Sequence, residues 1–145
     1  LVLVAAGCGR DSTGLPPARA AAEGVVFTDA FGEGVSFQGF SGSSTAALAI
    51  DSTVRRTGVA SLRINVPLPN DPTGSYAGGA FVAATARDLS GYDALTFWAR
   101  ASINASLNVA GLGNDNTGSS RYTAQRADVP LTTEWRKVVI PIPLP

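Results

Sequence analysis

Along Leu95-Thr96-Phe97-Trp98-Ala99-Arg100, the side chains of an extended strand point alternately to its two faces. One face, with Leu95, Phe97 and Ala99, is apolar throughout and is expected to be buried. The other face combines an aromatic ring, a hydroxyl and a guanidinium. The alternation therefore predicts a β-strand with one face in the core and one chemically distinctive face.

Similar runs recur from Val25 onward, rich in Val, Ile, Phe and Thr and separated by Gly, Pro, Asn and Asp. None sustains a helical period for three turns, and the pattern is typical of an antiparallel β-sandwich. The expected strands are residues 25–31, 36–40, 45–50, 61–66, 75–83, 94–101, 105–112, 121–127 and 136–142. The apolar side chains expected between two packed sheets are Leu62, Ile64, Leu95, Phe97, Leu107, Val109, Val138 and Ile140.

The last expected strand runs directly into Pro141, Pro143 and Pro145, with no closing strand after it. Proline cannot donate to a sheet ladder. We therefore expect one domain over residues 25–145 that is truncated at its C-terminus.

The first residues, Leu1-Val2-Leu3-Val4-Ala5-Ala6-Gly7-Cys8, form an apolar run that closes on small residues before the only cysteine. This run resembles the end of a bacterial lipoprotein signal peptide. The resemblance implies a truncated signal over residues 1–7, a lipidated Cys8, and a flexible linker over residues 8–24. It also implies export to the bacterial cell envelope, facing the periplasm or the surface, with membrane contact through the lipid anchor only. The alternative is that Cys8 is a small buried residue after a short strand.

Composition excludes several function classes. Eleven basic and eleven acidic residues cancel, whereas a nucleic-acid-binding domain normally carries a basic excess. Histidine is absent, which removes histidine-based triads and the usual zinc sites. The acidic residues are scattered singly, many beside turn residues, so most are expected to brace turns rather than to form a catalytic pair. The chain is therefore expected not to be an enzyme.

Several segments together resemble the jelly-roll carbohydrate-binding modules of the galactose-binding-like superfamily. They are Val26-Phe27-Thr28-Asp29-Ala30-Phe31, residues 57–64, Tyr76-Ala77-Gly78-Gly79, residues 88–100, and residues 133–141. Their order and spacing carry the resemblance, which spans nearly everything after the linker. It implies a jelly roll that binds polysaccharide or oligosaccharide.

Gly58 follows a polar turn and precedes an expected strand, where a positive φ is needed to reverse the chain. In the modules that this chain resembles, the same loop often lends oxygens to a structural calcium ion. By that resemblance, Asp29 and Thr57 are candidate calcium ligands. Calcium takes six to eight oxygens, so plain turn chemistry is the competing interpretation.

The candidate sugar-binding residues are Trp98, Arg100 and Thr96, with Asn108 on the following strand and Tyr76 among small residues that leave room for a groove. An aromatic ring stacks on the apolar C–H face of a sugar, while a guanidinium or an amide bonds its hydroxyls. The alternative is that Trp98 packs beneath a loop and that Arg100 forms a surface ion pair. Trp135, at a strand entrance, is expected to be a structural plug.

These observations predict a lipid-anchored, exported β-sandwich that binds polysaccharide without hydrolysing it. One alternative is a structural or adhesive sandwich without a sugar site. Another is an accessory domain of a glycoside hydrolase whose catalytic part lies beyond residue 145. One sandwich fold hosts many functions, so the fold alone does not decide among them.

The lipid anchor can be tested by fractionating cells that express the chain behind a complete signal peptide. The parent should partition with membranes, because the several acyl chains of a bacterial lipoprotein hold firmly. Cys8→Ser should release the protein to the soluble fraction. Unchanged membrane association of that variant would contradict the anchor.

Overall fold

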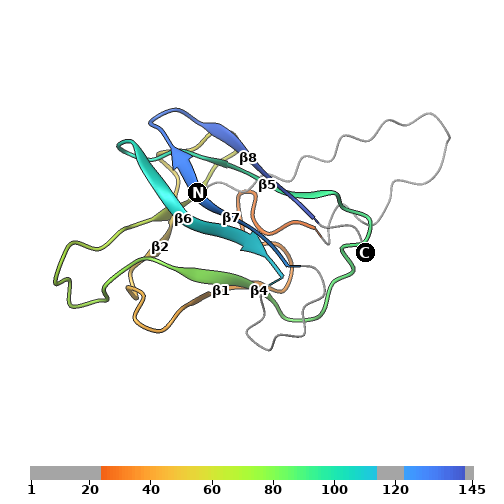
Figure 1. Cartoon of the computed structure of the whole chain (residues 1–145), viewed down its shortest axis with the longest axis horizontal. Coiled ribbons are helices and arrows are strands. Elements are labelled where there is room, and N and C mark those ends of the chain that lie inside the picture. Colours follow the sequence, from red (N-terminus) through yellow and green to blue (C-terminus); the bar gives the residue numbers. More distant parts are fainter. Residues whose placement is uncertain (1–23, 114–122, 143–145) are drawn as a thin grey trace. The chain divides into compact units, whose positions relative to one another are not determined.

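The computed structural model describes residues 24–113 and 123–142, so Cys8 and the expected signal and linker lie outside the described residues. Every regular element in these ranges is a β-strand, and all named strands pair antiparallel (Figure 1). The all-β antiparallel class expected from the sequence is therefore confirmed. The same ranges contain no helix with the length and apolarity needed to cross a membrane. The chain forms two compact units, Leu1–Asp88 and Leu89–Pro145.

The first unit contains two strand pairs. Strand β1 (Val35–Gly39) pairs with β4 (Gly79–Ala83), and β2 (Leu48–Asp51) pairs with β3 (Ser61–Ile64). In the β1–β4 pair Phe37 stands opposite Phe81. The alternation along β1 leaves Phe37 on the half-buried face and the polar side chains of this strand on the exposed face.

The described core of the first unit is built around phenylalanine rings. Phe27 is completely buried and meets Phe31 edge to face, with ring centroids 5.5 Å apart. The ring centroid of Phe81 lies 6.1 Å from that of Phe31 and 5.4 Å from that of Phe37. Edge-to-face and tilted rings are favoured over face-to-face stacks, so this cluster packs β4 against the segment that precedes β1.

The expected strand at residues 25–31 is wrong. The amide of Thr28 donates to the carbonyl of Ala30, and the amide of Gly32 donates to that of Val26, so the chain folds back within six residues. Only an isolated bridge joins Phe27 and Phe31. The physical reason is that packing the two rings against each other requires a turn between them, whatever the strand propensity of the residues.

The second unit also contains two strand pairs. Strand β5 (Ala94–Ala99) pairs with β8 (Arg136–Pro141), and β6 (Ala105–Leu112) pairs with β7 (Ala124–Leu131) (Figure 1). Phe97 stands opposite Val138 and Leu95 opposite Ile140, which puts their side chains on one face. That face is buried at Phe97 and Ala99 on β5 and at Val138 and Ile140 on β8, as the alternation predicts.

Half of the expected core residues are buried, and one of the others is clearly wrong. Leu62, Phe97, Val138 and Ile140 are buried, and Ile64, Leu95 and Leu107 are half-buried. Val109, by contrast, is 59% exposed. Among the described strands, β6 and β7 pair only with each other. Their ladder has no pair between Asn108 and Asp128, and Asp128 has a positive φ of +50°. Beyond that break the strand pair is exposed on the face where burial was expected.

Several strand boundaries also shift. The segments expected at 45–50 and 75–83 begin later, at Leu48 and Gly79, and the segment expected at 121–127 extends to Leu131. That last strand includes Pro130. A proline is tolerated there because β7 pairs on one side only, and an edge strand does not need every amide.

The core assignment predicts unequal effects for two alanine substitutions. Phe97→Ala leaves a cavity where a ring is 2% exposed, so it should lower the free energy of unfolding by about 3 to 5 kcal/mol. Val109→Ala removes an exposed side chain and should change it by less than about 0.5 kcal/mol. Chemical denaturation of both variants measures the difference, and equal effects would contradict the assignment.

Candidate functional site

Tyr76 lies in the loop that precedes β4, and hydrogen bonds hold it at both ends. Its hydroxyl donates to the carbonyl of Ser41 over 3.0 Å. Its own carbonyl accepts from the amide of Ser44 over 2.7 Å, and a parallel bridge joins it to Ser43. The side chain nevertheless remains 40% exposed. The sequence-predicted sugar contact is thus a fixed ring that solvent can reach.

Phe40, directly after β1, supplies a second exposed ring beside Tyr76. Its side chain is 49% exposed, and its amide donates to the carbonyl of Gly78 over 3.1 Å. A side-chain carbon on Gly78 would lie 2.8 Å from the Tyr76 ring and 3.6 Å from the Phe40 ring. Atoms of both rings therefore lie close to one glycine, and any larger residue there would displace Tyr76. The exposed pair Phe40 and Tyr76, with the loops that carry them, is called the aromatic loop site below.

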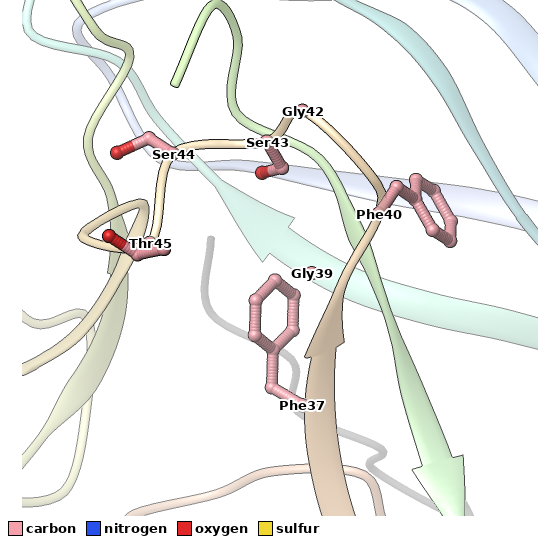
Figure 2. A pocket seen from close by; sticks show the side chains of 7 residues that line it. All are labelled: Phe37, Gly39, Phe40, Gly42, Ser43, Ser44 and Thr45. Atoms are coloured by element: carbon pink, nitrogen blue, oxygen red, sulfur yellow. The ribbon is translucent and has the colours of Figure 1, made fainter. Parts of the chain in front are cut away.

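A hollow of about 490 Å³ lies beside these loops. Figure 2 shows Phe37 and Phe40 on opposite sides of the chain, with three hydroxyl side chains along the bend that follows. The residues that line the hollow are Phe37, Gly39, Phe40, Gly42, Ser43, Ser44 and Thr45. None of them is charged. The chemistry offered is aromatic and hydroxylic, which suits a neutral polar ligand.

Backbone and hydroxyl contacts make this site rigid. The hydroxyl of Ser43 accepts from the amide of Gly78 over 3.0 Å, and the Ser44 hydroxyl shares a 2.7 Å hydrogen bond with that of Thr73. Gly74 has φ of +153°, and a side-chain carbon there would lie 2.3 Å from the Ser44 nitrogen. Only glycine fits this approach. Residues 40–45 and 73–78 are thus fixed against each other before any ligand binds.

Asp71 braces the same loop from outside. Its carboxylate accepts from the hydroxyl of Thr73 over 2.6 Å and from the amide of Thr73 over 2.8 Å. These two hydrogen bonds, the hydroxyl first, hold the pKa of Asp71 below its usual range. The carboxylate therefore serves the turn, as the sequence predicted for most acidic residues of this chain.

The second unit carries the other predicted sugar contacts. Thr96, Trp98 and Arg100 follow one face of β5 and its continuation, and all three are half-buried. The opposite face of β5 is buried at Phe97 and Ala99, so the predicted division of the two faces is correct. Trp98 is thus neither fully sealed in a core nor widely exposed.

Asn108 and Tyr76 are not brought to the Trp98 face by hydrogen bonding between strands. Asn108 is exposed on β6, which pairs with β7, whereas β5 pairs with β8. The expectation that Asn108 follows on the strand next to Trp98 therefore does not match the pairing. Tyr76 belongs to the first compact unit and Trp98 to the second.

The candidate calcium ligand Asp29 holds a turn instead of standing free. One of its carboxylate oxygens, Oδ1, accepts from the amides of Val59 over 2.7 Å and Ala60 over 3.0 Å. Gly58 has the positive φ that the sequence predicted, +67°, and a side-chain carbon there would lie 2.2 Å from this oxygen. The amide bonds, that of Ala60 foremost, hold the pKa of Asp29 below its usual range.

Calcium at this loop stays a prediction. Asp29 and Thr57 supply at most a few of the six to eight oxygens that calcium takes. Among the described residues, no cluster of three or more His, Cys, Asp or Glu side chains could hold a metal ion.

Phe40 and the hydroxyls beside it were not singled out from the sequence. The available signal was an aromatic residue at the end of an expected strand, followed by Ser41-Gly42-Ser43-Ser44-Thr45. That run predicts a turn, but nothing in one sequence says that residue 76 folds against it. Only the structure shows that Tyr76 and Gly78 hydrogen-bond to Ser41 and Ser43, which lie more than thirty positions away in the sequence.

Antiparallel β-strands and exposed aromatic rings on fixed loops are features of β-sandwich carbohydrate-binding modules. Comparison with protein families identifies which one. The chain belongs to the carbohydrate binding domain 30 family, whose model matches residues 24–143. Neither a curated protein nor a solved structure matches the chain significantly.

The braced carboxylates predict a loss of stability in acid. Asp29, Asp51 and Asp71 all have lowered pKa values, and that of Asp51 falls from 3.8 to about 2, chiefly because the Thr53 hydroxyl and then two backbone amides bond its carboxylate. A folded pKa below the unfolded value means that the ionised form stabilises the fold. This contribution should be complete above pH 3.8 and should fall as the pH drops toward about 2.

Denaturation at a series of pH values tests this expectation, with Asp51→Asn as the comparison. The variant should be less stable at neutral pH, because the charge-assisted bonds are lost, and its stability should depend less on pH below 3.8. Identical acid profiles for parent and variant would contradict the role of Asp51.

Proposed function

We propose that this module binds polysaccharide without hydrolysing it, and that the aromatic loop site is its principal contact. The observation that carries the proposal is the pair of exposed rings, Phe40 and Tyr76, fixed above Gly78 by hydrogen bonds. Sugar rings present apolar C–H faces that stack on aromatic rings. The hydroxyls along the hollow add donors and acceptors for sugar hydroxyls.

Pre-organisation supports this site over a purely structural role for the rings. Binding costs less when loops and side chains are already ordered. Here the Tyr76 hydroxyl and the Ser43 hydroxyl fix the loops through contacts that leave Phe40 and Tyr76 partly exposed. A ring kept only for packing would be expected in the phenylalanine cluster with Phe27 and Phe81.

The affinity of a single site is expected to be low. Each hydrogen bond to a sugar hydroxyl replaces a bond to water and contributes about 1 kcal/mol net. A polymer presents many equivalent sugars, so repeated contacts raise the apparent affinity. The proposed ligand is therefore a polysaccharide rather than a free monosaccharide.

Further sugar contacts are proposed in the second unit, at Trp98, Arg100, Thr96 and Asn108.

The carboxylates of the first unit support a role without hydrolysis. Glycosidases place two carboxyl groups about 5 to 9.5 Å apart across the scissile bond. Asp29, Asp51 and Asp71 are instead occupied by amides and hydroxyls of their own turns. Their lowered pKa values also make them poor proton donors at neutral pH.

The proposed location is the bacterial cell envelope. The apolar run that ends at Cys8, the only cysteine, supports lipid anchoring there. An anchored module that binds polysaccharide would hold its protein against a glycan at the outer membrane, in the periplasm or at the cell surface. Such a module commonly serves a partner domain that processes the bound polymer.

Affinity electrophoresis against β-glucans, xylans, mannans and galactans tests the site. The parent should be retarded by at least one of them. Tyr76→Ala and Phe40→Ala should each weaken retardation severalfold, and the double variant by about tenfold or more, because each aromatic contact is worth about 0.5 to 1.5 kcal/mol. Val66→Ala is the matched control, since it removes a side chain that is 78% exposed in another loop of the same unit.

Two outcomes would contradict the proposal. If no glycan retards the folded parent, polysaccharide binding is wrong. If the folded double variant migrates like the parent and like Val66→Ala, binding occurs elsewhere and the aromatic loop site is wrong. Tyr76→Phe separates the two roles of Tyr76, because it keeps the ring and loses only the hydrogen bond to Ser41.

A further inference from the structure

The side of the β5–β8 pair that faces away from Phe97 carries two cations and an indole. Trp98 and Lys137 stand directly opposite each other in the ladder, and Thr96 stands opposite Val139. Arg100 follows β5 on the same side by alternation. These five residues, Thr96, Trp98, Arg100, Lys137 and Val139, are called the basic face. Lys137 and Val139 are exposed, and the other three are half-buried.

Strand geometry sets the spacing of the two cations and the ring. Directly opposite residues on one face have Cβ atoms about 4.5 to 5.5 Å apart, and diagonal neighbours about 7 to 8 Å apart. Lys137 is therefore next to Trp98, and Arg100 lies one residue beyond the last ladder pair, Ala99 and Arg136. The amide of Ala101 donates to the carbonyl of Thr132 over 2.8 Å, which keeps the chain at Arg100 alongside the segment that leads into β8.

Charge on this face is of one sign. The side chains that β5 and β8 present here are Ala94, Thr96, Trp98, Lys137, Val139 and Pro141, with no carboxylate among them. The chain as a whole is neutral, so this local excess of positive charge is a feature of the face rather than of the composition.

We propose that the basic face binds an acidic sugar residue, a uronic acid within a polysaccharide. The sugar ring stacks on Trp98 while its carboxylate is held by Arg100 and Lys137. A guanidinium matches a carboxylate with two parallel hydrogen bonds, and such charge-assisted bonds are about twice as strong as neutral ones. This goes beyond the aromatic loop site, which is lined by uncharged residues and suits neutral sugars.

The experiment measures binding of the 145-residue chain to polygalacturonate and alginate, beside the neutral glycan that retards it best. Arg100→Gln and Lys137→Gln should each weaken binding to the acidic polymers by at least about tenfold. Arg100→Lys keeps the charge but loses the planar fork, so it should fall between parent and Arg100→Gln. Trp98→Ala should also weaken binding, while Val66→Ala, which changes a side chain that is 78% exposed outside both proposed sites, should leave it unchanged.

Arg136→Gln is the matched control. It removes one positive charge from the same strand, but Arg136 stands opposite Ala99 and so lies on the other side of the pair. Polyglutamate, a polyanion without sugar rings, is the matched ligand control. Raising the ionic strength from about 0.01 to about 1 M shortens the Debye length from about 30 to about 3 Å, and should weaken acidic-glycan binding far more than neutral-glycan binding.

The outcomes separate this inference from the proposed function. If the parent binds neutral glycans but neither acidic polymer, the acidic-sugar site is wrong and the aromatic loop site stands. If Arg136→Gln weakens binding as much as Arg100→Gln, or if polyglutamate binds equally well, the attraction is diffuse and no sugar site exists here. If the parent binds acidic polymers and no neutral glycan, the basic face stands and the aromatic loop site is wrong.

Discussion

The hydrogen bonds between residues 40–45 and residues 73–78 are the constraint on which the proposed sugar site depends. Those nearest the rings are Phe40 amide to Gly78, Gly78 amide to Ser43, Ser44 amide to Tyr76, and Tyr76 hydroxyl to Ser41. They join two segments that lie more than thirty residues apart. Together with the Ser43–Tyr76 bridge and the bonds of Thr73 to Ser44 and Thr45, these bonds hold the loops that carry the two exposed rings. The absence of a side chain at Gly78 then lets the rings approach the same point.

The parts of the fold that follow from alternation could be predicted from the sequence. Phe97 and Ala99 on β5, with Val138 and Ile140 on β8, are buried because every second residue of a strand shares a face. The same rule could not foresee Val109, whose strand has an exposed partner and a break in its ladder. Nor could it foresee the turn at residues 28–30, which exists because Phe27 and Phe31 pack on each other.

The candidate site was only half predictable for a related reason. Tyr76 stood out because small residues surround it, and Gly58 because a turn there needs a positive φ, which the structure has. Phe40 gave no such signal, since its partner Tyr76 is set by long-range hydrogen bonds and not by local spacing. Asp29 was expected near Gly58 by resemblance, and it does bond that turn through the amides of Val59 and Ala60.

The central claim is that sugar lies on the Phe40 and Tyr76 rings, and nuclear magnetic resonance tests it most directly. An oligosaccharide from the best-binding neutral polysaccharide would be titrated into the isotope-labelled chain while amide and aromatic shifts are followed. The account predicts that the changes concentrate in residues 40–45 and 73–78, with direct magnetisation transfer between sugar protons and the two rings. Changes confined to other residues, with these two rings unaffected, would contradict it.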